Sequence, residues 1–218
     1  MSSLHYAERP PAGEPEGLLI LHHGRGSDEL DLLTLADVLD PHRRLHVVTP
    51  RAPLQLPGSP GYHWYLVPKV GHPDPDSFRA AHQALAELHD ELTQKTGVEP
   101  AKTVLGGFSM GCVMSYALGL DATRPRPAGI LAFSGFIPTV SGWEPDLAGR
   151  KGLPVFIAHG GRDAVISVDF GRDAAQRLRD GGLAVDYHES EASHHIDPRE
   201  LPSAAAWLAR TLEEEQAL

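Results

Sequence analysis

The chain has 218 residues, of which 19 are Lys or Arg and 29 are Asp or Glu, so its formal charge is −10 with histidine neutral. This charge argues against nucleic-acid binding, because such binding depends on clustered cations and the longest basic run is Arg43-Arg44. No apolar stretch approaches the roughly 20 residues that span a bilayer, and residues 1–17 lack the apolar core of a secretory signal. We therefore expect a cytoplasmic protein without integral membrane association.

Apolar segments of strand length alternate with segments of helical periodicity from residue 17 onward. Strands are expected at Gly17–His22, Leu45–Thr49, Thr103–Phe108, Gly129–Phe133, Pro154–His159 and Ala184–His188. Helices are expected at Asp28–Leu39, Ser77–Thr96, Ser109–Gly119, Val168–Asp180 and Arg199–Glu215. Because most of the strands are aliphatic throughout rather than alternating, they indicate a parallel sheet with helices on both faces. The sequence thus predicts an α/β fold, with one domain over 17–218 and an N-terminal extension over 1–16.

Two connections depart from this alternation. Residues 50–75 hold seven prolines and three glycines, which makes a loop far longer than the usual connection in a compact domain. Loops of this length are usually functional, and this one carries Tyr62, Trp64 and Tyr65. The second connection, residues 136–152, is irregular and too short to form a separate domain.

The segment Gly107-Phe108-Ser109-Met110-Gly111 lies between an expected strand and an expected helix. It matches the G-x-S-x-G nucleophile elbow, in which serine occupies a tight strand-to-helix turn and the glycines relieve crowding of the backbone. A pattern this short also occurs by chance, but the strand before it and the helix after it are the context that the mechanism requires. Ser109 is therefore the predicted nucleophile.

A serine hydroxyl needs a base to remove its proton and usually a carboxylate to orient that base. In this arrangement the acid and then the histidine follow the serine, each in a loop after a later strand. Asp163 occupies such a loop, whereas Asp173 repeats the same Gly-Arg-Asp-Ala context inside an expected helix and is the less favoured acid. His194 and His195 both follow the last expected strand, and periodicity does not choose between them.

The oxyanion formed when serine attacks a carbonyl requires backbone N–H donors. Met110, directly after the serine, supplies one donor by geometry. The segment Leu19–Gly26 offers the other, because an aliphatic strand there ends in a His-Gly turn that lets the backbone approach a substrate.

Together these motifs resemble the carboxylesterase/phospholipase family of α/β-hydrolases, which includes the acyl-protein thioesterases. The resemblance spans about residues 17–212 and implies a mostly parallel sheet and no cofactor. The short connection over 136–152 leaves no room for a large cap domain. No metal is expected, because no other His, Cys or carboxylate near His194 and His195 shows a ligand spacing. The resemblance is carried by the segments Leu21–Asp28, Pro50–Pro53, Trp64-Tyr65, Gly107–Gly111, Phe133–Gly135, His159–Asp163 and Ser193–Ile196.

The resemblance implies a role for individual residues. Ser109 would be the nucleophile, Asp163 the orienting acid and His194 the base, since Ile196 lies two residues beyond His194 as in the family's Gly-His-x-Ile/Val pattern. Ser193 replaces the glycine of that pattern, which keeps His195 as the alternative base.

The resemblance also implies that the N–H groups of Arg25 and Met110 bind the oxyanion. Arg25 stands where the family commonly carries an apolar residue. The candidates for the pocket wall are Trp64, Tyr65 and Phe136.

The predicted function is hydrolysis of short- to medium-chain acyl esters, thioesters or lysophospholipids through an acyl-serine intermediate, with a small-molecule ester as the partner. Family members often associate near the cleft, so a homodimer is a candidate assembly. The alternatives are a non-catalytic ligand-binding or scaffold protein on the same fold, a thioesterase or acyltransferase with the same triad, and a hydrolase with a cysteine nucleophile. For the last of these, Cys112 lies three residues beyond Ser109 and outside the elbow.

Overall fold

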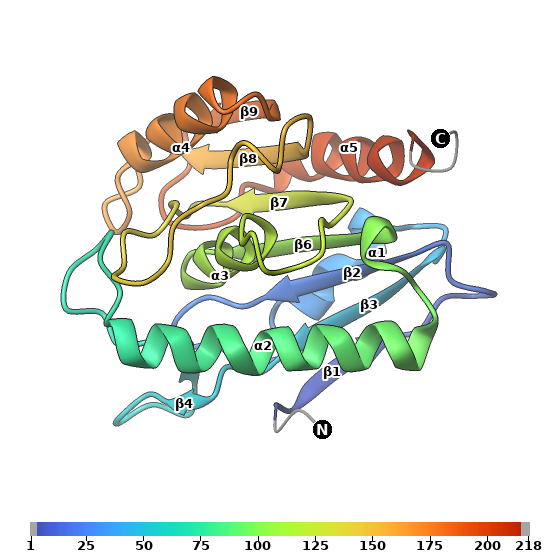
Figure 1. Ribbon diagram of the computed structural model, residues 1–218, viewed down its shortest axis with the longest axis horizontal. Helices are drawn as coiled ribbons and strands as arrows, with labels where there is room; N and C mark the ends of the chain where they lie inside the picture. Colours follow the sequence, from blue (N-terminus) through green and yellow to red (C-terminus); the bar gives the residue numbers. More distant parts are fainter. Residues whose placement is uncertain (1–3, 215–218) are drawn as a thin grey trace.

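A seven-stranded sheet in the order β1-β3-β2-β6-β7-β8-β9 forms the centre of the computed structural model, which describes residues 4–214 (Figure 1). β1 runs antiparallel to β3, and every other pair of neighbours in this sheet is parallel. The predicted α/β fold with a mostly parallel sheet is confirmed. The strands of the sheet are β1 (Tyr6–Arg9), β2 (Gly17–His22), β3 (Leu45–Pro50), β6 (Thr103–Phe108), β7 (Gly129–Phe133), β8 (Pro154–Gly160) and β9 (Ala184–Ser190).

Helices cover both faces of this sheet. The helices α2 (Pro75–Thr96), α3 (Met110–Gly119) and α4 (Val168–Asp180) pack on one face, and α1 (Ala36–Leu39) and α5 (Leu201–Glu214) pack on the other (Figure 1). In β2, Leu18 and Ile20 join the cluster formed with α2 and α3, whereas Leu19 and Leu21 join the cluster formed with α1 and α5. Because side chains alternate between the faces, a strand covered on both sides is apolar at every position. No helix within residues 4–214 is long and apolar enough to cross a membrane.

α2 begins two residues earlier than the periodicity predicted. The side chain of Asp74 accepts a hydrogen bond from the Ser77 N–H at 2.9 Å, and Pro75 occupies the first turn. Both residues favour a helix start, since the carboxylate satisfies a free N–H and proline has none to satisfy. Gly97, with a φ of 71°, ends the helix.

The helix predicted at Asp28–Leu39 is wrong over its first part. A 3₁₀-helix covers Leu32–Leu35, and α1 adds only one further turn. The Asp28 carboxylate accepts a hydrogen bond from the Leu30 N–H at 2.9 Å, and this local turn competes with a helix. At the C-terminal end, a 3₁₀-helix over Pro198–Glu200 precedes α5, and the predicted last residue, Glu215, lies outside the described residues.

Two further pieces of strand were not expected from the sequence. Within the segment that we set apart as an N-terminal extension, β1 pairs with β3 and buries Arg9, whose guanidinium bonds to Asp40. The long loop over 50–75 contains a small antiparallel pair, β4 (Leu54–Gln55) and β5 (Tyr62–His63). Residues 136–152 form no helix and hold one isolated bridge, between Val140 and Trp143.

The carboxyl ends of β2, β6, β8 and β9 meet at the same edge of the sheet, because these strands are parallel and lie close together in its order. In open α/β sheets this edge is where ligands bind. The loops that leave these four strands carry all the residues predicted for catalysis.

Candidate active site

Ser109 is the single residue between β6 and α3. Its backbone has φ 55° and ψ −118°, a conformation that non-glycine residues rarely adopt. The Ser109 N–H donates to the carbonyl of Phe133 at 2.9 Å, which ties the turn to β7. The structure thus places Ser109 on a sharp, strained turn at the edge of the sheet.

The two glycines of the elbow are required by close backbone contacts. A Cβ added to Gly107 would lie 2.6 Å from the carbonyl carbon of Gly111. A Cβ added to Gly111 would lie 1.9 Å from the carbonyl oxygen of His22. Neither position can hold a side chain unless the backbone moves, so the turn around Ser109 depends on both glycines.

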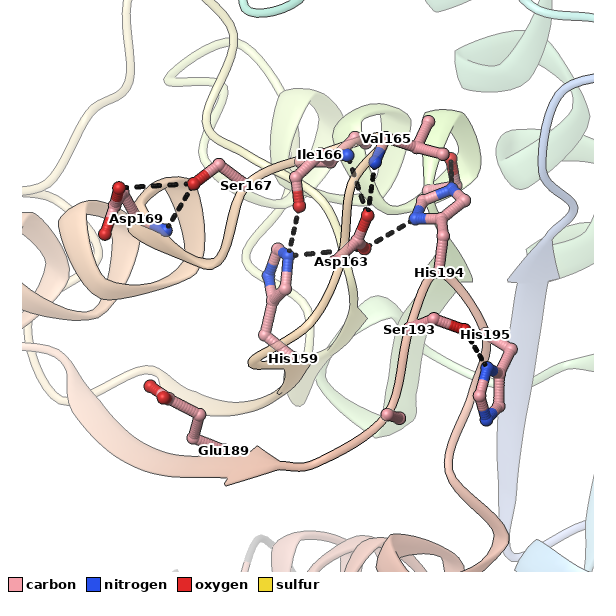
Figure 2. Close-up of polar contacts among 12 residues, drawn as sticks. His159, Asp163, Val165, Ile166, Ser167, Asp169, Glu189, Ser193, His194 and His195 are labelled. Carbon is pink, nitrogen blue, oxygen red and sulfur yellow. Dashed lines mark hydrogen bonds and ion pairs between the residues drawn. The ribbon is translucent and has the colours of Figure 1, made fainter.

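His194 links Ser109 to Asp163. Its Nε2 lies 2.9 Å from Ser109 Oγ, and its Nδ1 lies 2.6 Å from Asp163 Oδ2. The second oxygen of Asp163 accepts hydrogen bonds from the N–H groups of Val165 at 2.9 Å and Ile166 at 2.8 Å (Figure 2). With Nδ1–H donating to the carboxylate, Nε2 is left to accept from the serine hydroxyl.

A second histidine, His159, lies on the other side of Asp163 (Figure 2). Its Nε2 is 2.9 Å from the carbonyl oxygen of Ile166 and 3.6 Å from Asp163 Oδ2. Burial lowers the pKa of His159, so the ring is neutral and its Nε2–H donates to Ile166. His159 belongs to a segment that carries the resemblance but received no role of its own from the sequence, although a histidine at the end of a strand, four residues before the acid, is a readable signal.

The alternative base, acid and nucleophile considered from the sequence lie apart from Ser109, His194 and Asp163. His195 points away from Asp163, and its Nδ1 lies 3.1 Å from Ser193 Oγ (Figure 2). Asp173 is exposed on α4 and pairs with Arg177 at 3.6 Å. Cys112 is fully buried in α3, and burial raises the pKa of its thiol. The structure brings together Ser109 and His194 with Asp163, and none of these alternatives.

The loop after β2 is held next to Ser109 by its histidine. His23 donates from Nδ1 to the carbonyl of Gly24 at 2.7 Å and accepts at Nε2 from the Ala52 N–H at 3.0 Å. Its own carbonyl accepts a hydrogen bond from Trp64 Nε1 at 2.9 Å. These contacts fix the backbone that leads into Arg25.

The two predicted oxyanion donors lie on neighbouring segments, Arg25 in the loop after β2 and Met110 at the start of α3. Met110 is the first residue of α3, where N–H groups have no preceding carbonyl in the helix to bond. The Arg25 N–H donates to no other group within residues 4–214. A Cβ built on Gly24 would be 3.5 Å from the Cβ of Ser109, so the Arg25 segment packs directly against the elbow.

A pocket of about 250 Å³ opens beside Ser109. Two of the three predicted wall residues, Tyr65 and Phe136, line it, but Trp64 does not. Trp64 is fully buried, because its ring packs against His23 and its indole N–H anchors the loop described above. The pocket is lined by Arg25, Tyr65, Val67, Val70, Phe108, Ser109, Met110, Phe136, Val165, Ile166 and His194.

Residues 7–212 match the sequence profile of the phospholipase/carboxylesterase family. The chain belongs to this family. It is accordingly an esterase-type hydrolase with an α/β-hydrolase fold, as the sequence predicted.

Curated relatives of this phospholipase/carboxylesterase chain match over most of its length. Lysophospholipase-like protein 1 of Mus musculus is 28% identical over 216 residues, which cover 93% of this chain and 90% of the relative. Acyl-protein thioesterase 1 of Yarrowia lipolytica is 28% identical over 212 residues, which cover 90% and 92% of the two chains.

Solved structures agree with this family membership. Esterase PE8 superposes with a TM-score of 0.82 at 30% identity, covering 95% of this chain and 99% of its own. A Bacillus cereus carboxylesterase superposes with a TM-score of 0.83 at 23% identity, covering 96% and 95% of the two chains, and shares the fold.

Proposed function

We propose that this esterase-type hydrolase cleaves carboxylic esters with short- to medium-chain acyl groups through an acyl intermediate on Ser109. The observation that carries the proposal is the alignment of His194 between Ser109 Oγ at 2.9 Å and Asp163 Oδ2 at 2.6 Å. A nucleophile in hydrogen-bond reach of a base, with the base oriented by a buried carboxylate, is the arrangement that activates a serine hydroxyl.

In the first half-reaction, Ser109 Oγ attacks the ester carbonyl carbon while His194 Nε2 takes the hydroxyl proton. The negative charge that forms on the carbonyl oxygen is stabilised by the N–H groups of Arg25 and Met110. The bond from the carbonyl carbon to the alcohol oxygen then breaks, and His194 returns the proton to that oxygen. The alcohol leaves, and the acyl group stays on Ser109.

In the second half-reaction, a water molecule takes the place of the alcohol. His194 removes a proton from the water, whose oxygen attacks the acyl carbon, and the bond to Ser109 Oγ breaks as Oγ regains the proton. The products are the free carboxylic acid and the original enzyme. A thioester reacts by the same steps with a thiol as leaving group, and the names of the thioesterase relatives support thioesters as a second substrate class.

The size and lining of the pocket support the chain-length part of the proposal. A pocket of about 250 Å³ walled by Phe136 and valine side chains suits a short apolar acyl group. The test is hydrolysis of p-nitrophenyl esters from acetate to palmitate by the wild type and by Ser109→Ala. We expect a rate maximum at short or medium chains in the wild type and a loss of about 10⁴-fold or more in the variant.

Ser203→Ala, a serine-to-alanine change on α5, is the matched control and should keep wild-type rates. Retained hydrolysis by Ser109→Ala would contradict the acyl-serine mechanism. A rate maximum at palmitate would contradict the chain-length assignment while leaving the mechanism intact.

A further inference from the structure

Arg25 brings a positive charge without a partner into the pocket beside Ser109. Its side chain is exposed and lines the pocket. Within residues 4–214 its guanidinium forms no ion pair and no hydrogen bond. By contrast, Arg51 is held by Glu29 in an ion pair.

The backbone of Arg25 is fixed on both sides by glycine contacts. Gly24 packs on the elbow, where an added Cβ would lie 3.0 Å from Phe108 Cδ1. The Gly26 N–H donates to the carbonyl of Tyr62 at 2.8 Å. Gly61 lies so close to Gly26 that a Cβ added to Gly61 would be 1.9 Å from the Gly26 carbonyl oxygen. The backbone of Arg25 is therefore held in place next to the elbow, and the guanidinium extends from this fixed position.

No carboxylate lines this pocket to neutralise Arg25. Asp163 is buried behind His194 and already accepts hydrogen bonds at both oxygens. Apart from Arg25 and His194, the lining is apolar or carries a hydroxyl.

An unpaired guanidinium is suited to a planar anion. Its fork of N–H donors matches the two oxygens of a carboxylate or phosphate. The chain as a whole carries a formal charge of −10, which disfavours the approach of anions to most of its surface. The positive charge of Arg25 attracts anions to the pocket beside Ser109.

We propose that Arg25 makes this enzyme prefer esters that carry a carboxylate or phosphate over neutral esters of the same size. The inference rests on the proposed function of Ser109. The anionic group belongs either to the acyl part of the ester or to its alcohol part, and the experiment separates the two.

The experiment compares two matched pairs of esters. For the acyl part, mono-p-nitrophenyl glutarate is compared with p-nitrophenyl pentanoate, which has the same number of acyl carbons and no terminal carboxylate. For the alcohol part, 4-(butanoyloxy)benzoate is compared with its methyl ester. The quantity measured is the ratio of kcat/KM for the anionic ester to kcat/KM for the neutral one, which cancels any general loss of activity.

We expect Arg25→Met to lower this ratio by about 10- to 100-fold in one of the two pairs, the effect of losing a charge-assisted hydrogen bond. Arg25→Lys, which keeps the charge but not the fork, should retain part of the preference. Arg126→Met is the matched control, because Arg126 bonds to the carbonyl of Lys151 and does not line the pocket. Added salt should reduce the wild-type ratio.

A ratio that Arg25→Met leaves unchanged in both pairs overturns the role of Arg25, provided that the wild type hydrolyses the neutral esters and Ser109→Ala does not. If the folded wild type hydrolyses none of the four esters, the proposed function fails first and the role of Arg25 fails with it. The two failures are therefore distinguishable.

Discussion

The α-carbon of Gly111 lies against the backbone carbonyl of His22, which connects the start of α3 to the end of β2. Ser115 strengthens the same junction, since its Oγ donates to the Gly111 carbonyl at 3.0 Å and lies 2.8 Å from Nδ1 of His22. Ser109 directly precedes α3, and the Arg25 loop follows β2. This contact therefore sets the separation between the proposed nucleophile and the proposed oxyanion donor.

Gly111→Ala should destabilise the protein strongly. The added methyl group would lie 1.9 Å from the His22 oxygen and 2.6 Å from the His23 oxygen, so the backbone of β2 or α3 would have to move. We expect the free energy of unfolding in urea to fall by about 3 kcal/mol or more. Gly13→Ala is the matched control, because a Cβ at position 13 meets nothing within 4 Å, and it should stay within about 0.5 kcal/mol of the wild type. Equal stabilities of the two variants would contradict this reading of the junction.

Asp163→Asn should lower kcat for p-nitrophenyl butyrate by about 10⁴-fold, because an amide does not hold His194 in the tautomer that accepts the serine proton. The chain supplies a close control in Asp173→Asn, which alters the same Gly-Arg-Asp-Ala context on the exposed side of α4. That variant should keep the wild-type rate. A large loss in Asp173→Asn with little change in Asp163→Asn would reassign the acid.

The adjacent histidines should separate sharply in the same assay. His194→Ala removes the group that contacts both Ser109 and Asp163, so we expect a loss of about 10⁴-fold or more. His195→Ala removes a side-chain contact with Ser193 that lies outside the group formed by Ser109, His194 and Asp163, and it should change the rate by no more than a few-fold. Circular dichroism of both variants checks that the fold is retained. Comparable losses from the two changes would argue against His194 as the sole base.

His22 at the end of β2 and His89 in α2 are stacked, and they should make the protein sensitive to acid. Burial lowers the pKa of His22 to about 3 and that of His89 well below its usual value, and their ring centroids lie 5.6 Å apart. The unfolded chain binds protons at these sites below pH 6.5, while the folded chain does not, so stability falls as the pH drops from about 6.5 toward 3. Between pH 7 and pH 5, each such histidine should cost about 2 kcal/mol.

Urea unfolding of His89→Leu at these two pH values tests the effect. Nε2 of His89 has no hydrogen-bond partner among the described residues, so leucine sacrifices no bond there. The free energy of unfolding of the variant should fall by about 2 kcal/mol less than that of the wild type between pH 7 and pH 5. His42→Leu, a change at an exposed histidine, should leave the pH dependence of the unfolding free energy unchanged. If His89→Leu follows the wild-type pH dependence, the buried ring is not the source of the acid sensitivity.

The features that the sequence predicted well are those with local steric or chemical requirements. The strands are covered on both faces and so are apolar throughout, and the elbow around Ser109 needs glycines at two defined positions. The order of strands and loops placed Asp163 and narrowed the base to His194 or His195, and the family resemblance then favoured His194. The structure brings Asp163 and His194 to Ser109.

The features that were missed depend on contacts between distant parts of the chain. Trp64 was expected at the pocket wall, but its ring fills the space beside His23 instead. Val67 and Val165 line the pocket because the long loop over 50–75 and the connection from β8 to α4 meet there, which no periodicity reveals. β1 was missed because an edge strand that is partly exposed carries polar residues and lacks the apolar run of the central strands.

The role of Ser109 as the nucleophile is tested most sharply by identifying the residue that a fluorophosphonate labels, by mass spectrometry of the digested protein. We expect one adduct, on Ser109, with no labelling of Ser109→Ala and with a loss of ester hydrolysis proportional to the labelling. An adduct on another residue, or hydrolysis that continues after Ser109 is fully labelled, would contradict this role.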